Sequence, residues 1–299
     1  MVSEERAWKG VTGGSAFGQK AMKILFSIVH VRVGYAILVF VVPFYMLFSH
    51  AKYLAIYRYF RKQHGHPPVK SFIKCYRNHF LFGQMILDRF AVYAGQKKFK
   101  VDNPDNDLFL EMVYAQHGCI IASSHVGNPE LCGYLLCQQT KRINSMIYGG
   151  EAEEIQKNRT KILAKNNVRL IPVSDDMSHV FLLNEALTNG EMVSMPCDRT
   201  FGSGKSVECD FLNGKVDFPV GAFVLALQYQ VPVIALFVLK KSASLYRIHV
   251  ISVPVPQDVQ VTDKREQINR MTRSFANILE DIVMRYPEQW FNFYDFWKS

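Results

Sequence analysis

The feature that most constrains this chain is a long apolar run over residues 24–48, which reads ILFSIVHVRVGYAILVFVVPFYMLF. His30 and Arg32 are its only strongly polar members, and residues 33–48 carry no charge. A helix that crosses a bilayer needs about 20 apolar residues. The run can therefore span a membrane with Arg32 reaching back to the surface, lie partly sunk in one leaflet, or form a buried core helix of a soluble protein. In each case we expect Pro43 to kink it.

The charge of the chain is concentrated around this run. The first 100 residues hold 16 lysines and arginines against three acids, whereas the other 199 residues hold 19 against 23. The net charge of +9 therefore belongs to the first third of the chain, which needs an anionic partner such as a membrane surface or nucleic acid. No zinc-finger, RNP-like or KH-like motif occurs. We expect a membrane and no nucleic acid, and favour a monotopic anchor with the bulk of the protein in the cytoplasm.

The rest of the chain alternates short β-forming runs with helices. With 299 residues, 49% hydrophobic and 20% charged, the chain can bury a large core, which excludes general disorder. The pattern predicts strands over residues 119–123, 143–148, 168–173, 191–195, 207–211, 231–239 and 245–251. It predicts helices over residues 103–117, 129–139, 151–166, 178–189, 219–229 and 263–285, and two more between 51 and 94 around a turn at 64–68.

This rhythm is typical of an α/β fold with a mixed, largely parallel sheet covered by helices. We expect residues 1–100 to form a basic, membrane-anchoring helical extension and residues 101–299 to form the catalytic domain.

The most informative stretch is residues 119–135, CIIASSHVGNPELCGYL, an apolar strand followed by a polar turn and a helix. The turn carries His125 and, five residues later, Glu130 at the start of the helix, with Asn128 as the expected N-cap. A carboxylate bound to one imidazole nitrogen fixes the tautomer and makes the other nitrogen a better base. The alternative is a histidine that only makes local hydrogen bonds at a helix start.

Other reaction classes lack their motifs. Ser123 and Ser124 are not part of a G-x-S-x-G elbow, so we expect the acceptor hydroxyl, and no protein side chain, to be the nucleophile. The nine histidines show no H-E-x-x-H or paired-ligand spacing, and neither a dinucleotide fingerprint nor a Walker loop occurs. We therefore expect neither a metal nor a cofactor.

Four stretches resemble the bacterial lipid A biosynthesis lauroyl/myristoyl acyltransferase family, within the lysophospholipid acyltransferase superfamily. They are HVGNPE (125–130), ALTNGEMVSMPCDRTFG (186–202), FPVGAFVLALQYQVPVIALF (218–237) and YPEQWFNFYDFW (286–297). The resemblance implies an acyltransferase at the cytoplasmic face of the bacterial inner membrane. It would move a fatty acyl chain from an acyl carrier protein or coenzyme A thioester to a hydroxyl or amine of a lipid, a lipid A precursor.

The resemblance also implies roles for individual residues. His125 would be the general base and Glu130 its orienting partner, which would place the pKa of His125 somewhat above about 6.5. Asp198 fits an aspartate of the family. Arg159 is our choice for the cation that stabilises the oxyanion, with Arg169 as the competitor. We expect the substrate to contact four further residues, namely Gly127, Asn128, Arg199 and Gly202.

The acceptor stays open at this point, because Pro129 stands where many family members carry an aromatic residue. Another lysolipid or an amino-acid lipid is an alternative acceptor. A thioesterase-like hydrolase, with water in place of the acceptor, is an alternative activity, and a scaffold or lipid-binding protein with an idle site is a third.

Overall fold

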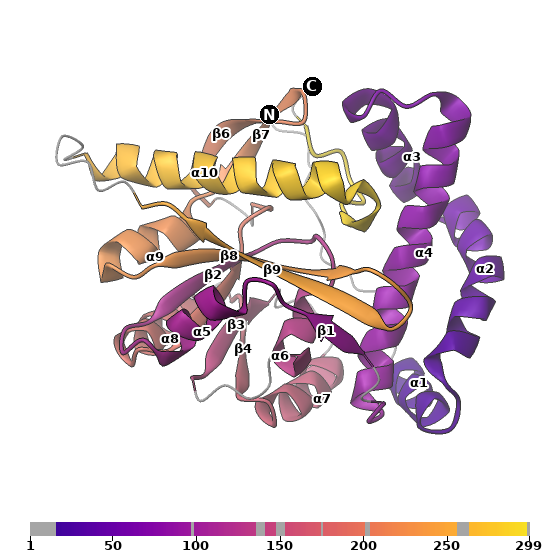
Figure 1. Cartoon of the computed structure of the whole chain (residues 1–299), viewed down its shortest axis with the longest axis horizontal. Coiled ribbons are helices and arrows are strands. Elements are labelled where there is room, and N and C mark those ends of the chain that lie inside the picture. Colours follow the sequence, from indigo (N-terminus) through magenta and orange to yellow (C-terminus); the bar gives the residue numbers. More distant parts are fainter. Residues whose placement is uncertain are drawn as a thin grey trace.

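A mixed, largely parallel sheet forms the centre of the protein (Figure 1). The computed structural model describes residues 16–96, 99–135, 141–147, 153–174, 176–200, 204–255 and 263–297. In these residues the sheet has seven strands, in the order β1 (Lys100–Asp102), β9 (Leu245–Val253), β8 (Val233–Lys240), β2 (Cys119–Ser123), β5 (Met192–Pro196), β3 (Ile143–Ile147) and β4 (Val168–Pro172). Only β8 and β9 pair antiparallel within it. The predicted α/β class is confirmed.

Helices cover both faces of the sheet, as the alternation of buried side chains requires. Ile120 and Ala122 of β2 belong to a core packed under α8 (Ser178–Thr188), α9 (Gly221–Tyr229) and α10 (Lys264–Arg285). Cys119 and Ile121 point to the other face, where α5 (Asn106–Tyr114) and α7 (Glu153–Ala164) pack. All five residues of β2 are buried, so this strand holds the middle of the core.

Some predicted boundaries need correction. Phe218 and Pro219 end strand β7 (Gly214–Pro219), which pairs with β6 (Ser206–Phe211) as a hairpin outside the main sheet, and the helix that we expected to begin at Pro219 begins at Gly221. The helix expected over residues 129–139 begins as a 3₁₀ turn (Pro129–Leu131) followed by α6 (Cys132–Leu135), and residues 136–139 lie outside the described part.

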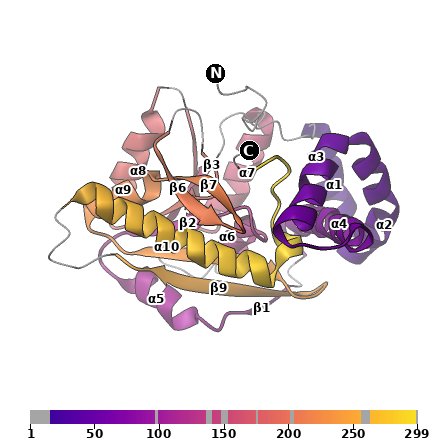
Figure 2. The ribbon, with the colours of Figure 1, turned by 90° about the horizontal axis from the view of Figure 1, so that it is seen from above.

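The N-terminal helices form a group of their own beside the sheet, with α4 between α2 and the α/β part (Figures 1 and 2). They are α1 (Ala16–Ile28), α2 (Val31–Phe48), α3 (His50–Arg58), a π-helical turn (Tyr59–Gln63) and α4 (Pro68–Tyr93). The apolar run is therefore divided between two helices. The imidazole Nδ1 of His30 accepts from the backbone N–H of Arg32 at 3.2 Å and caps α2.

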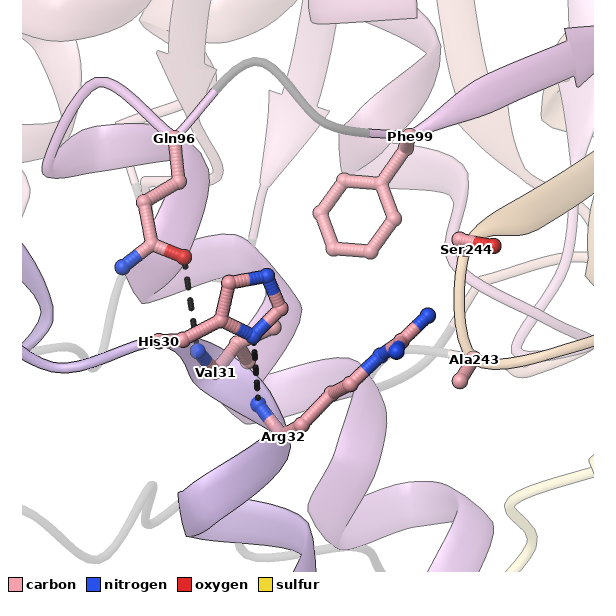
Figure 3. Close-up of a pocket in the computed structure, with 7 residues that line it drawn as sticks. All are labelled: His30, Val31, Arg32, Gln96, Phe99, Ala243 and Ser244. Atoms are coloured by element: carbon pink, nitrogen blue, oxygen red, sulfur yellow. Dashed lines mark hydrogen bonds between the residues drawn. The ribbon is translucent and has the colours of Figure 1, made fainter.

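Gln96 holds the corner between α1 and α2 (Figure 3). Its amide donates to the carbonyl of Val29 at 2.8 Å and accepts from the N–H of Val31 at 3.4 Å. A cavity of about 230 Å³ lies between this corner and the β8–β9 turn, with Arg32 extending toward Ala243. The corner explains why the run does not form one continuous helix.

Helix α2 is apolar on both sides but buried on only one. Its 18 residues have a mean hydropathy of 2.0, and only 22% of them are buried. The buried residues are Val31, Tyr35, Val42 and Met46. Phe40, Phe44 and Phe48 on the other side are 73%, 63% and 83% exposed. Such a contiguous exposed apolar surface is typical of a membrane-contacting face.

A buried cluster of charged and phenolic groups joins these helices to the sheet. Asp88 of α4 accepts hydrogen bonds from Lys240 at the end of β8, from Tyr35 of α2 and from Tyr246 of β9. The ammonium of Lys240 also donates to the Tyr35 hydroxyl at 3.0 Å. The side chains of Lys240 and Asp88 are 2% and 0% exposed. A buried pair of this kind is tolerated only because each charge finds its partners, so the two parts of the chain must pack in one arrangement.

We expect Lys240→Met to destabilise the protein strongly, because it leaves the Asp88 carboxylate buried and uncompensated. The expected loss in the free energy of unfolding is about 3–5 kcal/mol, measured by denaturant unfolding in detergent. Arg169→Met is the matched control: Arg169 is 39% exposed and lies 3.5 Å from Glu185. Its loss should stay below about 1 kcal/mol. Equal losses in the two variants would contradict a structural role for the buried pair.

Candidate active site

The carboxyl ends of two neighbouring strands bring the central residues of the site together. β2 and β5 are parallel, and Ser123 lies opposite Pro196 at the end of each. The backbone N–H of Cys197 still donates to the carbonyl of Ser123 at 2.8 Å. His125 and Asp198 each follow two residues after their strand, so they meet at the same edge of the sheet, where ligands of α/β proteins commonly bind.

His125 and Asp198 form a tight pair. The imidazole Nδ1 lies 2.9 Å from Oδ1 of Asp198, and the backbone N–H of His125 donates to Oδ2 at 2.8 Å. The Asp198 side chain is 1% exposed, whereas that of His125 is 31% exposed. An aspartate acceptor at Nδ1 places the proton on Nδ1, so Nε2 carries the lone pair that can accept a proton. The pair therefore has the chemistry of a general base with its orienting carboxylate.

This geometry corrects the partner that we expected from the sequence. Glu130 does not orient His125, because Asp198 occupies that position and the carboxylate of Glu130 is bound elsewhere. Arg89 of α4 donates to its Oε2 at 2.7 Å, and Arg159 of α7 donates to Oε1 and Oε2 at 3.3 and 3.1 Å. The Tyr93 hydroxyl of α4 donates to Oε1. The physical reason is that the 3₁₀ turn at Pro129–Leu131 directs Glu130 toward α4 and α7.

The pKa values follow from these surroundings. Burial lowers the pKa of His125 below 6.5; Asp198 raises it without cancelling the effect of burial, and Arg199 lowers it further. The raised value expected from the sequence is therefore wrong, because burial outweighs the carboxylate. Burial alone would raise the pKa of Glu130, but Arg89 and Arg159 outweigh it and bring the value to about 2. Glu130 is an anion at neutral pH, and His125 is neutral.

Gly127 and Asn128 shape the loop between these residues, which we call the His125 loop (residues 125–131). Gly127 has a φ of +70°, and a Cβ there would collide with the carbonyl oxygen of Val238. The backbone N–H of Asn128 donates to that carbonyl at 2.8 Å. The Asn128 side chain donates to the carbonyl of Met85 at 3.2 Å, so it ties the loop to α4. Substrate contact by either residue stays a prediction.

The C-terminal segment packs against the same loop. The N–H of Phe291 donates to the carbonyl of His125 at 3.0 Å. Arg199, which is 5% exposed, donates to the carbonyl of Phe291 at 2.7 Å and stacks over Tyr294, with its guanidinium carbon 5.3 Å from the ring centroid. Arg199 thus links the segment after β5 to the end of the chain, and its predicted contact with substrate stays a prediction.

The remaining predicted residues divide into three cases. Arg159 lies at Glu130, as described above. Arg169 lies on β4 and pairs with Glu185 of α8. Gly202 lies outside the described residues. Among the residues that are described, no group of three histidine, cysteine or acidic side chains is arranged to hold a metal ion.

Arg89 and Tyr93 are the site residues that the sequence analysis missed. Both lie on α4, more than 30 residues before the His125 loop. Their only sequence signal is a spacing of four residues, which places both side chains on one helical face, in a helix that carries many other polar side chains.

We expect Gly127→Ala to cost more stability than Gly65→Ala. Both glycines have a positive φ, +70° and +62°, but nothing lies within 4 Å of a Cβ at Gly65. Gly65→Ala should therefore lower the free energy of unfolding only by the cost of placing alanine in the left-handed conformation, about 1–2 kcal/mol. Gly127→Ala adds a backbone collision and should cost about 2–5 kcal/mol in the free energy of unfolding. Equal losses would show that the close approach to Val238 is relieved without cost.

Comparison with known proteins identifies the family of the chain. A family model described as bacterial lipid A biosynthesis acyltransferase matches residues 82–299, a region that begins within α4 and includes His125, Glu130, Arg159 and Asp198. No curated protein matches the chain. The match covers most of the chain, and it confirms the resemblance found in the sequence motifs. The chain belongs to the bacterial lipid A biosynthesis acyltransferase family and is an acyltransferase.

Proposed function

We propose that the protein transfers a fatty acyl chain from the thioester of an acyl carrier protein or coenzyme A to a hydroxyl or amine of a lipid, with a lipid A precursor as the acceptor. The observation that carries this proposal is the His125–Asp198 pair, a base that faces solvent on one side and a buried carboxylate on the other. Membership of the family supplies the reaction class. No protein nucleophile is required, because the acceptor itself attacks.

The proposed reaction uses Nε2 of His125 twice. Nε2 takes the proton of the acceptor hydroxyl while the hydroxyl oxygen attacks the thioester carbonyl. The attack forms a tetrahedral oxyanion. Asp198 accepts the hydrogen bond from Nδ1–H and stabilises the imidazolium. When the intermediate collapses, the carbon–sulfur bond breaks and the imidazolium returns its proton to the thiolate. The products are an acyl ester, or an amide when the acceptor is an amine, and a free thiol.

Arg159 remains our candidate for the cation that stabilises the oxyanion. Two hydrogen bonds to Glu130 fix the plane of its guanidinium, and its side chain is 15% exposed. A preorganised donor of this kind lowers the barrier by about 3 kcal/mol, because it needs no reorientation as the charge develops. In this proposal Glu130 positions the guanidinium of Arg159, and Asp198 orients the imidazole of His125.

We also propose that the helices before residue 100 hold the enzyme at the cytoplasmic face of the inner membrane, and that residues 101–299 form the catalytic domain. The exposed phenylalanines of α2 would contact the acyl chains of one leaflet. Between residues 6 and 87 the chain contains no acid, so its cations would meet anionic headgroups. The packing of α2 on α4 favours a helix that lies in the leaflet.

The direct test supplies the purified protein with a labelled acyl chain on acyl carrier protein or on coenzyme A, with and without a lipid A precursor. We expect labelled acylated lipid to form only when the acceptor is present, with both products identified by mass spectrometry. Free fatty acid released at the same rate with and without acceptor would instead identify a hydrolase. Acylation of a different lysolipid or an amino-acid lipid would correct the acceptor.

Two variants connect this activity to the site. His125→Ala should lower kcat by about 10²–10⁴-fold, because it removes the base. Asp198→Asn keeps the size of the side chain but favours the wrong tautomer, and should lower kcat by up to about 10⁴-fold. Asp176→Asn, an exposed aspartate, is the matched control and should retain full activity. Full activity in His125→Ala would refute the mechanism.

The pH dependence should reflect the lowered pKa of His125. The base works only when neutral, and burial disfavours the imidazolium, so kcat/KM should rise with pH through an ionisation below 6.5 and stay level above it. A rate profile with soluble acceptor analogues in detergent measures this limb. An acid limb above 6.5 would mean that the carboxylate outweighs burial, contrary to the structure.

A further inference from the structure

Helix α4 contacts the His125 loop at three successive turns. The carbonyl of Met85 accepts from the Asn128 side chain at 3.2 Å, the Arg89 guanidinium donates to Glu130 at 2.7 Å, and the Tyr93 hydroxyl donates to the same carboxylate. Residues 85, 89 and 93 are spaced by four, which places them on one face of the helix. One stripe of α4 therefore contacts the His125 loop at Asn128 and at Glu130.

The Glu130 carboxylate is the point at which three elements meet. Its Oε1 accepts from Tyr93 and Arg159, and its Oε2 accepts from Arg89 and Arg159. The side chain is only 14% exposed, so these hydrogen bonds are largely shielded from water. Arg89 on α4 and Arg159 on α7 are thus held in a fixed relation by one anion, which is itself part of the His125 loop.

We infer that Arg89 is a positioning residue for the reaction, which acts through Glu130 on the His125 loop and on the guanidinium of Arg159. The inference rests on the proposed function. Without Arg89, Oε2 of the carboxylate keeps its hydrogen bond from Arg159, but the loop loses its charged link to α4, and both the loop and Arg159 gain freedom to move. Small displacements of a reacting group have large effects on rate, because reaction requires close and aligned atoms.

The first test measures the kinetics of Arg89→Met, with Arg270→Met as the matched control, because Arg270 of α10 is 44% exposed and lies 3.1 Å from Glu266 of the same helix. We expect Arg89→Met to lower kcat by about 10- to 100-fold with KM changed less than about twofold, and Arg270→Met to leave both unchanged. The acid limb of kcat/KM should stay where it is, because the His125–Asp198 pair is intact. Arg89→Lys, which keeps a cation at Glu130, should recover part of kcat.

A double-variant cycle shows whether Arg89 acts through Glu130. If it does, Arg89→Met combined with Glu130→Gln should lose no more activity than the more damaging single variant. Losses that multiply, or a raised KM with unchanged kcat, would overturn the inference in favour of direct contact with substrate. If Arg89→Met does not fold, Tyr93→Phe removes only a hydroxyl from the same carboxylate and should lower kcat in the same way. Wild-type kcat in Tyr93→Phe would then overturn the inference.

Hydrogen exchange separates this inference from the proposed function, because it needs no substrate. We expect the amides of the His125 loop to exchange faster in Arg89→Met than in the wild type and in Arg270→Met. Unchanged exchange in the loop would overturn the positioning role, whatever the activity. An inactive wild type with faster exchange in Arg89→Met would refute the proposed acyl transfer while leaving the contact between α4 and the loop established.

Discussion

The parallel pairing of β2 with β5 is the constraint on which the site depends. Because Ser123 and Pro196 end their strands at the same level, the residues that follow must emerge side by side. Asp198 then receives both the backbone N–H and the imidazole of His125, which fixes the position and the tautomer of the ring together. A slip in this register would leave a carboxylate buried without its partner, so the fold and the chemistry are stabilised by the same contact.

Helix α4 gives the molecule its second constraint. On one side Asp88 binds Lys240 and the two tyrosines that join α2 to the sheet, and on the adjacent side Arg89 binds the carboxylate of Glu130. The helices that present an apolar surface and the loop that carries the base are therefore attached to neighbouring residues of one rigid element. This arrangement supplies a physical reason for the proposed anchor and the proposed reaction centre to share a packed interface.

Much of the sheet could be predicted from local pattern, because apolar runs between turn residues reveal buried strands such as β2 and β8. The partner of His125 could not be predicted in this way. Asp198 lies 73 residues away, and its contact depends on strand order, which no local pattern encodes. Glu130 follows His125 by five residues, a spacing that predicts a pair between them. The direction of the 3₁₀ turn at Pro129–Leu131, however, decides where the Glu130 side chain points. The pKa of His125 likewise depends on the burial of its ring. The break in the apolar run at His30 depends on a capping hydrogen bond, which cannot be predicted from the composition of the run.

The most direct measurement of the central claim is the protonation of the two ring nitrogens of His125, observed by ¹⁵N NMR of the histidine-labelled protein at pH 8. We expect a neutral ring with the proton on Nδ1 and a lone pair on Nε2, and a loss of this preference in Asp198→Ala. A proton on Nε2 in the wild type, or no response to the removal of Asp198, would contradict the central claim.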